Sequence, residues 1–512
     1  MEKGITTNQK QYSPITKTNA LANFRKSCSL LLVWLASLEV SIEAEPKKGF
    51  FRQNHWRFGR KAKFLTVFVI VAVMLISVFA FLPKQGVTKG NVIPPSGNST
   101  ATLSPTAKPP SNGKGLVSIN STHTFTVIGS GSPAAYVRPP GLIQSGTNIT
   151  SDVWLQVASY SWDYFQPGIG VDSNTGLPYA VGTSFTGFTD WDLGCYIQAL
   201  IDAQKLGLIG PDDLWGFNER VNLVLTFLEN RTLNSNTTYP YQFYDATNGS
   251  VYNMPQENYV DVTDTGRLFV ALYNLESYNS SYQNQIDYIV YDKCNYAALA
   301  PGIEQDSLTS VDMYSYFVYS GFASFFPDLS NAPNEVLTNI LKANVTYSPY
   351  GNVSLHDASI SGDPLLMSIF ELNNNDSRLL ALSQEVYLAS EAYYNATGNF
   401  AAFSEGNGYN GVFIDEWVVV PNGDTWVITT PGVSGYLSVD PVIYTKVAFS
   451  FLALYNTTYA RNMIIYLEQN LPLPVIGYAD GANNSGFAIS GIGSNTNQLI
   501  LDAALYALQN NL

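Results

Sequence analysis

Two acidic pairs at the starts of apolar helical segments are the first sign of chemistry in this 512-residue chain. Asp192 and Asp264 each begin such a segment, and a second acid lies close by at Asp190 and at Asp261. Carboxyl groups that share a site raise one another's pKa, so one of them keeps its proton while the other is ionised. Cleavage of a glycosidic bond needs such a pair, one group to protonate the leaving oxygen and one to activate water. Asp192 and Asp264 are therefore candidate catalytic residues.

Two glutamates in a β-type region are the other catalytic candidates. Glu405 lies in a Gly-rich stretch, and Glu416 follows Asp415 in an apolar run typical of a strand. Neighbouring residues of a strand point to opposite faces, so only one of Asp415 and Glu416 can face a cavity, and we favour Glu416. A simpler explanation stays open for the helix-start acids, because an Asp at the N-cap stabilises a helix by about 1 kcal/mol without any catalytic role.

Aromatic and polar side chains near these acids are candidates for binding a sugar. Aromatic faces suited to stacking on sugar rings are provided by Trp162, Trp191, Trp417, Trp426 and Tyr444. Polar candidates are Asp190, Asp261, Arg267, Asp440 and Asn497. For Trp417 and Trp426 the alternative is a cross-strand pair that only stabilises a hairpin.

Other chemistries find little support. Only His123 and His356 follow residue 82, and neither belongs to a motif for a metal site or a Ser-His-Asp triad. The chain has no phosphate-binding loop of the G-x-x-x-x-G-K-[ST] type. Residues 172–176 and 480–483 are oxygen-rich turns that could hold Ca²⁺, but ordinary turns explain them better. The sequence therefore predicts no metal and no cofactor.

Six apolar helical segments must position the candidate acids. Each begins at a short polar residue suited to capping the free N–H groups of a first turn: Asp192, Asp264, Asp312, Asp363, Asp440 and Asn497. Pro364 and Pro441 are expected at the first helical position, where no N–H is lost. Since these segments are almost entirely apolar or small, we expect them to be inner helices.

Six further helical segments have one polar face and are expected to be outer helices. They cover residues 150–165, 216–230, 281–293, 334–343, 376–394 and 457–470. Alternating inner and outer helices predict a mainly α fold, an (α/α)6 toroid of six helical hairpins, with an irregular all-helical bundle as the alternative. If the inner helices run parallel, the acids at their starts meet at one rim.

Small β-hairpins are expected among the long connections of this ring. Residues 411–430 contain two β-type runs around Pro-Asn-Gly-Asp, which is typical turn chemistry. Residues 239–262 carry a weaker version of the same pattern. Long connections in a compact fold commonly carry function.

An uncharged run at residues 64–82 is long enough to cross a membrane as one transmembrane helix. Residues 1–63 hold twelve Lys or Arg against four acids, which predicts a cytoplasmic N-terminus. The remainder carries fourteen basic and thirty-six acidic residues, a net charge of about −22, which argues against binding nucleic acid. Three cysteines cannot form a disulfide framework, and we expect Cys195 and Cys294 to be buried free thiols, with a disulfide between them as the alternative.

Glycosylation acceptors agree with this topology, because all of them follow the apolar run. The Asn-x-Ser/Thr sites are Asn98, Asn120, Asn148, Asn230, Asn236, Asn248, Asn279, Asn344, Asn352, Asn375, Asn395, Asn456 and Asn483. We expect a cytoplasmic segment at residues 1–63, the transmembrane helix at 64–82, a Pro/Ser/Thr-rich stalk at 83–117 and an extracellular toroid domain at 118–512.

Several short motifs resemble a family of exported prokaryotic domains. They are Trp162-Asp163-Tyr164-Phe165, Thr189-Asp190-Trp191-Asp192, Leu-Gly-Leu-Ile at 206–209, the segment 261–267 and Thr496-Asn497. The family is the domain-of-unknown-function 3131 family, and the resemblance covers roughly residues 150–512. Because the family resembles the α/α toroids of carbohydrate-active enzymes, the resemblance implies the fold and leaves the chemistry open.

The sequence thus predicts a single-pass membrane protein whose exterior domain binds, and in the stronger reading hydrolyses, glycans of the cell envelope. The alternative is a non-catalytic structural or adhesion component of the envelope. A receptor for a small exterior ligand is a third possibility, and it requires a closed apolar pocket.

Overall fold

The computed structural model describes residues 141–182, 185–253, 261–372, 376–408, 411–472, 476–489 and 491–511. All of them belong to one compact unit of the chain, Asn98–Leu512. The expected cytoplasmic segment, transmembrane helix and stalk lie outside the described residues. Within the described part of the chain, no helix is long and apolar enough to span a bilayer.

Six inner helices form a closed ring, as the sequence predicts. They are α4 (Asp190–Lys205), α6 (Val262–Tyr278), α9 (Met313–Phe325), α11 (Gly362–Glu371), α13 (Thr445–Tyr455) and α15 (Ser494–Gln509). Each packs against the next in chain order, and α15 packs back against α4. Most residues of these helices are buried, because each helix touches neighbours on several sides.

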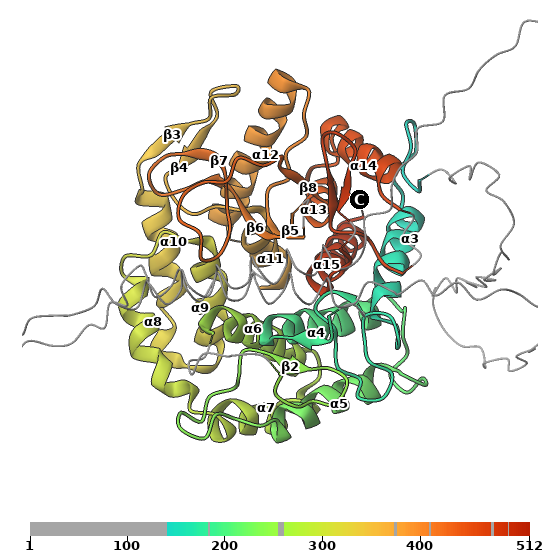
Figure 1. Ribbon diagram of the computed structural model, residues 1–512, viewed down its shortest axis with the longest axis vertical. Coiled ribbons are helices and arrows are strands. Elements are labelled where there is room, and N and C mark those ends of the chain that lie inside the picture. Colours follow the sequence, from blue (N-terminus) through green and yellow to red (C-terminus); the bar gives the residue numbers. More distant parts are fainter. Residues whose placement is uncertain are drawn as a thin grey trace, which may run out of the picture. The chain divides into compact units, whose positions relative to one another are not determined.

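Six outer helices surround the inner ring (Figure 1). They are α3 (Ser151–Trp162), α5 (Phe217–Asn230), α7 (Gln283–Asp287) with the π-helical turn η5 (Tyr288–Lys293), α10 (Ala332–Lys342), α12 (Ser377–Thr397) and α14 (Thr458–Asn470). Five of these outer helices come next in the chain after the inner helix against which they pack. The exception is α3, which packs on α15. The first and last long helices, α3 and α15, therefore form the sixth hairpin. The alternating inner and outer helices belong to a closed ring and not to an irregular bundle.

Shorter helices fill the connections between the hairpins. They are η2 (Asp163–Phe165), η4 (Ser280–Tyr282), η6 (Tyr296–Leu299), α8 (Ala300–Ser307) and η7 (Pro327–Leu329). Of these, α8 packs on the outer helix α10.

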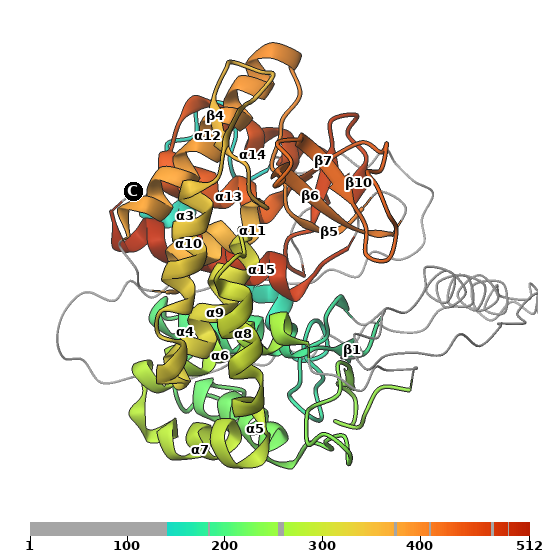
Figure 2. The same cartoon turned by 90° about the vertical axis from the view of Figure 1, so that its left-hand side faces the viewer.

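Among the described residues, four small antiparallel sheets accompany the ring. Their strands are β1 (Gly187–Phe188) with β2 (Tyr244–Asp245), β3 (Val345–Tyr347) with β4 (Ser354–His356), β5 (Glu405–Asn407) with β6 (Phe413–Val419) and β7 (Thr425–Thr429), and β8 (Val442–Tyr444) with β9 (Gly481–Asn483) and β10 (Ala488–Ile489). Figure 2 shows β1, the β5–β6–β7 sheet and β10 on the same side of the helices. The hairpin expected at 411–430 is confirmed as β6 and β7, and the weaker one at 239–262 is reduced to a bridge between Tyr244 and Val251.

Glycines let α6 and α9 approach closely within the ring. A Cβ atom on Gly321 would collide with the carbonyl oxygen of Gly266, and one on Gly266 would lie 2.7 Å from the carbonyl oxygen of Val318. The backbones of the two helices therefore touch at a point that admits no larger residue.

The inner helices share one polarity. At their N-terminal ends, Ser494 of α15 hydrogen-bonds Asp192 of α4, and Asn495 of α15 hydrogen-bonds Asp363 of α11. Lys446 of α13 forms an ion pair with the same Asp363. Four inner helices thus begin at one mouth of the ring, as expected for parallel packing.

The structure corrects the expected positions of several helix starts. Thr189 and Asp261 are the N-caps of α4 and α6, so Asp192 and Asp264 lie three residues further on. Asp312 does cap α9. Gly362 and Asp363 precede Pro364 in α11, so this proline is not the first helical residue.

The expected start at Asp440 is also wrong. Asp440 lies in an exposed loop, and the first helical residue of α13 is Thr445. Residues 442–444 between them form strand β8, which pairs with β9. The pairing takes this Val-Ile-Tyr run, which is β-prone, out of the helix.

Candidate functional site

Four acids at the starts of α4 and α6, here the α4–α6 acids, occupy one side of the mouth: Asp190, Asp192, Asp261 and Asp264. Asp192 closes the first turn of α4, because its Oδ2 accepts from the backbone N–H of Thr189 at 3.0 Å. The hydroxyl of Ser494 donates to its Oδ1 at 2.7 Å. Burial raises the pKa of Asp192, although these hydrogen bonds favour the ionised form.

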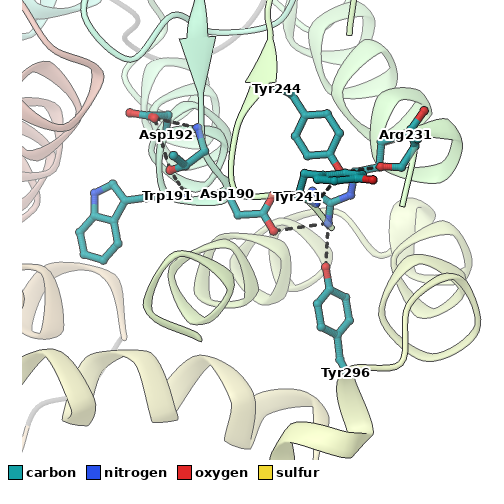
Figure 3. A network of polar contacts seen from close by, with 9 residues as sticks. Asp190, Trp191, Asp192, Arg231, Tyr241, Tyr244 and Tyr296 are labelled. Carbon is teal, nitrogen blue, oxygen red and sulfur yellow. Dashed lines mark hydrogen bonds and ion pairs between the residues drawn. The ribbon is translucent and has the colours of Figure 1, made fainter. Parts of the chain in front are cut away.

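Asp190 is held by an ion pair. Its carboxylate accepts from Arg231, which follows α5, and Nη2 of Arg231 donates to the hydroxyl of Tyr296 at 2.7 Å (Figure 3). The same figure shows the ring of Tyr244 beside the guanidinium, whose central carbon lies 5.6 Å from the ring centre. Arg231 and its partners therefore hold the carboxylate of Asp190 in one position.

The other three α4–α6 acids surround Asp264. Burial, followed by the charges of Asp261, Asp192 and Asp190, raises its pKa well above the ordinary value. Asp261 itself caps α6, because its Oδ1 accepts from the N–H of Asp264 at 3.2 Å. Asp264 is partly exposed, so a ligand at the mouth can reach its carboxyl group.

A second acidic cluster, here the hairpin acids, consists of Asp363, Glu405 and Asp415. Glu405 and Asp415 are direct partners across the β5–β6 ladder, so they share one face of the sheet. Burial, followed by the charge of Asp363, raises the pKa of Glu405 to about 8, whereas Lys446 opposes the shift. Glu405 is partly exposed and protonated at neutral pH, which are the properties of a general acid.

Glu416 lies on the opposite face of β6 from these acids. It is completely buried, and its Oε1 accepts from the backbone N–H of Val442 at 2.7 Å. Burial raises the pKa of Glu416 well above its usual range. This corrects the expectation that Glu416 faces the cavity, because Asp415 is the residue that shares a face with Glu405.

A row of aromatic rings links the two acidic clusters. Trp191 of α4 contacts Tyr314 of α9 with ring centres 6.1 Å apart, and Tyr314 contacts Trp417 of β6 at 6.0 Å. Trp191 adjoins two of the α4–α6 acids, and the charges of the hairpin acids Glu405 and Asp363, after burial, raise the pKa of Tyr314. The row therefore runs from one cluster to the other.

Within the aromatic row, Trp191 Nε1 and the hydroxyl of Tyr314 are buried polar atoms without a hydrogen-bond partner among the described residues. Most buried polar groups in native proteins are satisfied by protein or water, so both atoms are open to a polar ligand.

Two of the predicted aromatic residues lie away from the mouth. Trp162 is 4% exposed and lies between Phe165, at 5.6 Å, and the guanidinium of Arg220, at 5.1 Å. Trp426 packs against Phe403 at 5.1 Å and Tyr393 at 4.9 Å. Trp162 is therefore not free to stack on a sugar, whereas Trp426 is half-buried.

Trp417 and Trp426 are not a cross-strand pair, because Trp417 is opposite Val427 in the β6–β7 ladder. Tyr444 is fully buried beside Gly406, where an added Cβ would lie 2.8 Å from its ring. It therefore packs beneath β5 instead of presenting a ring face.

Three predicted polar residues have structural roles elsewhere. Arg267 is completely buried two turns into α6 and pairs with Glu371 at 2.8 Å. Asn497 is buried, and its Oδ1 accepts from the N–H of Tyr478 at 2.7 Å. Asp440 is exposed in the loop before β8. These positions do not bring the three side chains together with the acids.

Lys446 and Tyr314 belong to the site and were not predicted. Lys446 was recognisable as the lone charge in the apolar run from Pro441 to Tyr455, where a buried ammonium requires a partner. No feature of the sequence distinguished Tyr314, because the same segment contains several other tyrosines in similar surroundings.

The structure also describes the two cysteines, the oxygen-rich turn at Asp172 and the arrangement of potential metal ligands. Cys195 and Cys294 are buried free thiols, as expected. Oδ1 of Asp172 accepts from the N–H groups of Asn174 and Thr175, which is an ordinary turn. No cluster of potential metal ligands is present among the described residues.

Most described glycosylation acceptors are accessible. Exposed acceptors are Asn148, Asn230, Asn236, Asn248, Asn344, Asn352 and Asn395, and half-buried ones are Asn279 and Asn456. Asn483 is wrong as an acceptor in the folded protein, because it is 2% exposed and its Oδ1 accepts from the N–H groups of Ser485 and Phe487. Asn98, Asn120 and Asn375 lie outside the described residues.

The closed ring of helical hairpins and its acidic mouth define an α/α-toroid domain. The chain belongs to the family described as protein of unknown function (DUF3131), whose pattern matches residues 156–510. No curated protein sequence matches the chain.

Solved structures share the fold at low sequence identity. An endo-β-1,2-glucanase of Chitinophaga pinensis is 12% identical with a TM-score of 0.53, over 71% of this chain and 95% of that one. A glucoamylase-like protein of Bacteroides caccae is 14% identical with a TM-score of 0.52, over 70% and 95%. A β-1,2-glucanase of Parabacteroides distasonis is 13% identical with a TM-score of 0.51, over 71% and 57%.

Proposed function

We propose that the toroid domain binds glycans at the mouth of the ring and hydrolyses their glycosidic bonds. The observation that carries this proposal is the position of two partly exposed acids with raised pKa values, Asp264 and Glu405, in the clusters joined by the aromatic row. Aromatic faces between two carboxyl groups suit a sugar chain whose scissile bond must lie between an acid and a base. The fold shared with glucan-cleaving enzymes supports the same substrate class.

Glu405 is assigned as the general acid. Its pKa of about 8 keeps it protonated at neutral pH, so it can give a proton to the leaving oxygen. Asp264 is assigned as the general base in its ionised form, because a carboxylate whose pKa is raised by burial and by neighbouring charges is a stronger base than an ordinary one. Asp363, paired with Lys446, supplies a fixed negative charge beside Glu405.

The test is release of reducing ends by the full-length protein from a panel of polysaccharides that includes β-1,2-glucan and starch. Glu405→Gln and Asp264→Asn should each lose activity while keeping the far-ultraviolet circular dichroism spectrum of the wild type. Glu335→Gln, which changes an exposed acid on the outer helix α10, is the matched control and should retain activity. If the wild type releases nothing from any polymer, the non-catalytic envelope component becomes the better description.

We also propose that this domain is anchored at the outer face of the cell membrane by residues 64–82. The supports are the basic residues before that run, the acceptor sites confined to the chain after it, and the exposure of most described acceptors. Protease treatment of intact cells, followed by immunoblotting for each end of the chain, tests the topology. A C-terminal domain that survives on intact cells and is cut only after lysis would contradict it.

A further inference from the structure

A pocket lies in the outer layer of the toroid, at the π-helical turn that ends the α7 segment. Its volume is about 280 Å³, and its lining includes Thr238, Tyr291, Asp292, Lys293, Asn295 and Phe326. These residues come from the segment after α5, from η5 and its continuation, and from the end of α9. We refer to it as the π-helix pocket.

Two unusual backbone features meet in this pocket. A π-helix of six residues, Tyr288–Lys293, supplies part of its wall, and such turns are rare and frequently found at functional sites. Thr238, on another part of the wall, has a φ of +59°, which a β-branched residue rarely adopts. Backbone strain of this kind costs of order 1–3 kcal/mol and tends to persist where a ligand is bound.

The side chains of the pocket combine one fixed aromatic ring with several polar groups. Tyr291 is 49% exposed, yet its hydroxyl donates to the carbonyl oxygen of Phe325 at 2.8 Å, and its ring contacts Phe326 edge-on at 5.9 Å. An exposed ring held at both ends offers a flat apolar face at little entropic cost. Exposed Asp292 and Asn295 lie beside it.

This combination fits a saccharide. A pyranose ring has an apolar C–H face, which can lie on tyrosine, and hydroxyl groups at its edge, which need both donors and acceptors. The volume is slightly below the range of about 300–1,000 Å³ that is typical of pockets for drug-sized molecules, so it suits one or two sugar residues.

The π-helix pocket is distinct from the mouth of the ring. Buried Cys294 lines the pocket, and its thiol lies next to Arg231 and Tyr296. Those two residues extend to Asp190 on α4, as Figure 3 shows. The pocket therefore lies behind the Asp190–Arg231–Tyr296 network, whereas the aromatic row begins with Trp191 on the same helix.

We propose that the π-helix pocket is a second saccharide-binding site, and this inference rests on the proposed glycan-binding function of the domain. The saccharide has two possible sources: an external polysaccharide, or a glycan attached to Asn236. The second source follows from the sequence, because Thr238 is the hydroxyl residue of the Asn236-Thr237-Thr238 acceptor and also lines the pocket.

External polysaccharide is tested by affinity electrophoresis of the full-length protein in gels that contain β-1,2-glucan or starch. All proteins carry Glu405→Gln, so that hydrolysis does not remove the polymer. Tyr291→Ala should weaken retention about tenfold or more, as expected for loss of a stacked aromatic anchor. Tyr288→Ala is the matched control, because Tyr288 is 45% exposed on the same π-helix and does not line the pocket, so it should leave retention unchanged.

The attached glycan is tested by nitration of tyrosine, read out residue by residue by mass spectrometry. If the Asn236 glycan fills the pocket, Tyr291 is protected in the glycosylated protein and becomes reactive in Asn236→Gln, while Tyr288 reacts equally in both. Either a Tyr291-specific loss of retention or this Tyr291-specific protection supports the site. Equal behaviour of the Tyr291 and Tyr288 positions in both experiments overturns it.

Failure of the proposed catalytic function would look different. In that case the wild-type protein releases no reducing ends, but the retention and nitration differences between Tyr291 and Tyr288 can still be measured. Conversely, a protein that cleaves polymers and shows no such difference has an active mouth and no second saccharide site.

Discussion

Carboxyl groups at the mouth of the ring differ in their neighbours, and these neighbours decide what each residue can do. Asp190 and Asp363 form ion pairs with Arg231 and Lys446. Burial raises the pKa of the nearby Glu405, and the charge of Asp363 adds to this shift while Lys446 opposes it.

The pH dependence of activity should report Glu405. Since its pKa is about 8 and the general acid must be protonated, we expect kcat to fall as the pH rises through about 8. Glu405→Gln should lower kcat by roughly 10²–10⁴-fold at pH 6, the usual contribution of a general acid. Initial rates between pH 4 and pH 10 measure both effects. A wild-type rate that stays constant from pH 7 to pH 10 would remove Glu405 from this role.

Stability should change with pH in the same interval. Glu405 binds its proton more tightly in the folded state, so the unfolding free energy of the wild type should fall as the pH rises from about 4.5 to about 8. Glu405→Gln cannot ionise and should lose less stability over this range. Urea unfolding of both proteins at pH 5 and pH 8 measures the difference, and parallel changes in the two proteins would contradict the assigned shift.

The Lys446–Asp363 pair gives a further prediction. Lys446→Met leaves the completely buried Asp363 without its cation, which should lower the unfolding free energy by about 3–5 kcal/mol. Chemical denaturation at pH 7 measures this loss. The double variant Lys446→Met, Asp363→Leu should recover most of it, because removing both charges is far less costly than removing one. A single variant as stable as the wild type would mean that the two groups are not an ion pair in solution.

At the scale of the helices, the sequence predicted which segments are helical and misplaced several starts. The apolar periodicity of α4 and α6 is local and therefore readable, but Asp192 and Asp264 were taken for caps when Thr189 and Asp261 fill that position. The error has a physical cause: an acid in the third helical position also interacts with the first turn, so its type does not distinguish it from a cap.

Close packing of α6 and α9 makes a prediction about glycine. Gly321→Ala would place a methyl group against the carbonyl oxygen of Gly266, and we expect a loss of about 1–3 kcal/mol or more, because the backbone of one helix must move. Gly302→Ala on α8 is the control, because a Cβ there meets nothing within 4 Å and alanine favours a helix by about 1 kcal/mol. Urea unfolding midpoints should therefore move in opposite directions for the two variants.

At the scale of the whole domain, the ring was predictable and the site was predictable only in part. Twelve alternating helices follow from local patterns, and parallel inner helices bring Asp192 and Asp363 to one mouth. The pairing of Asp363 with Lys446 joins residues far apart in the chain, and the facing of Glu405 and Asp415 depends on strand register. The sequence near those residues indicates neither the ion pair nor the strand register. Without the register, the prediction could not tell which of Asp415 and Glu416 shares a face with Glu405, and it preferred Glu416.

Closure of the ring by the two ends of the domain leads to the last prediction. Helix α3 buries Trp154, Val157 and Ala158, and it packs on α15, so removing it exposes an apolar face along the last inner helix. Loss of a buried tryptophan alone costs about 3–5 kcal/mol, and the whole helix is comparable with the total stability of a domain, about 5–15 kcal/mol.

We therefore expect a chain that starts at residue 164 to lose cooperative thermal unfolding and to aggregate, as measured by circular dichroism and size-exclusion chromatography. A chain that starts at residue 150 keeps α3 with its cap Thr150 and is the matched control, which should melt cooperatively. If the chain from residue 164 melted at the same temperature as this control, five hairpins would suffice for the fold. The ring would then be an open arc whose stability does not depend on joining its first and last helices.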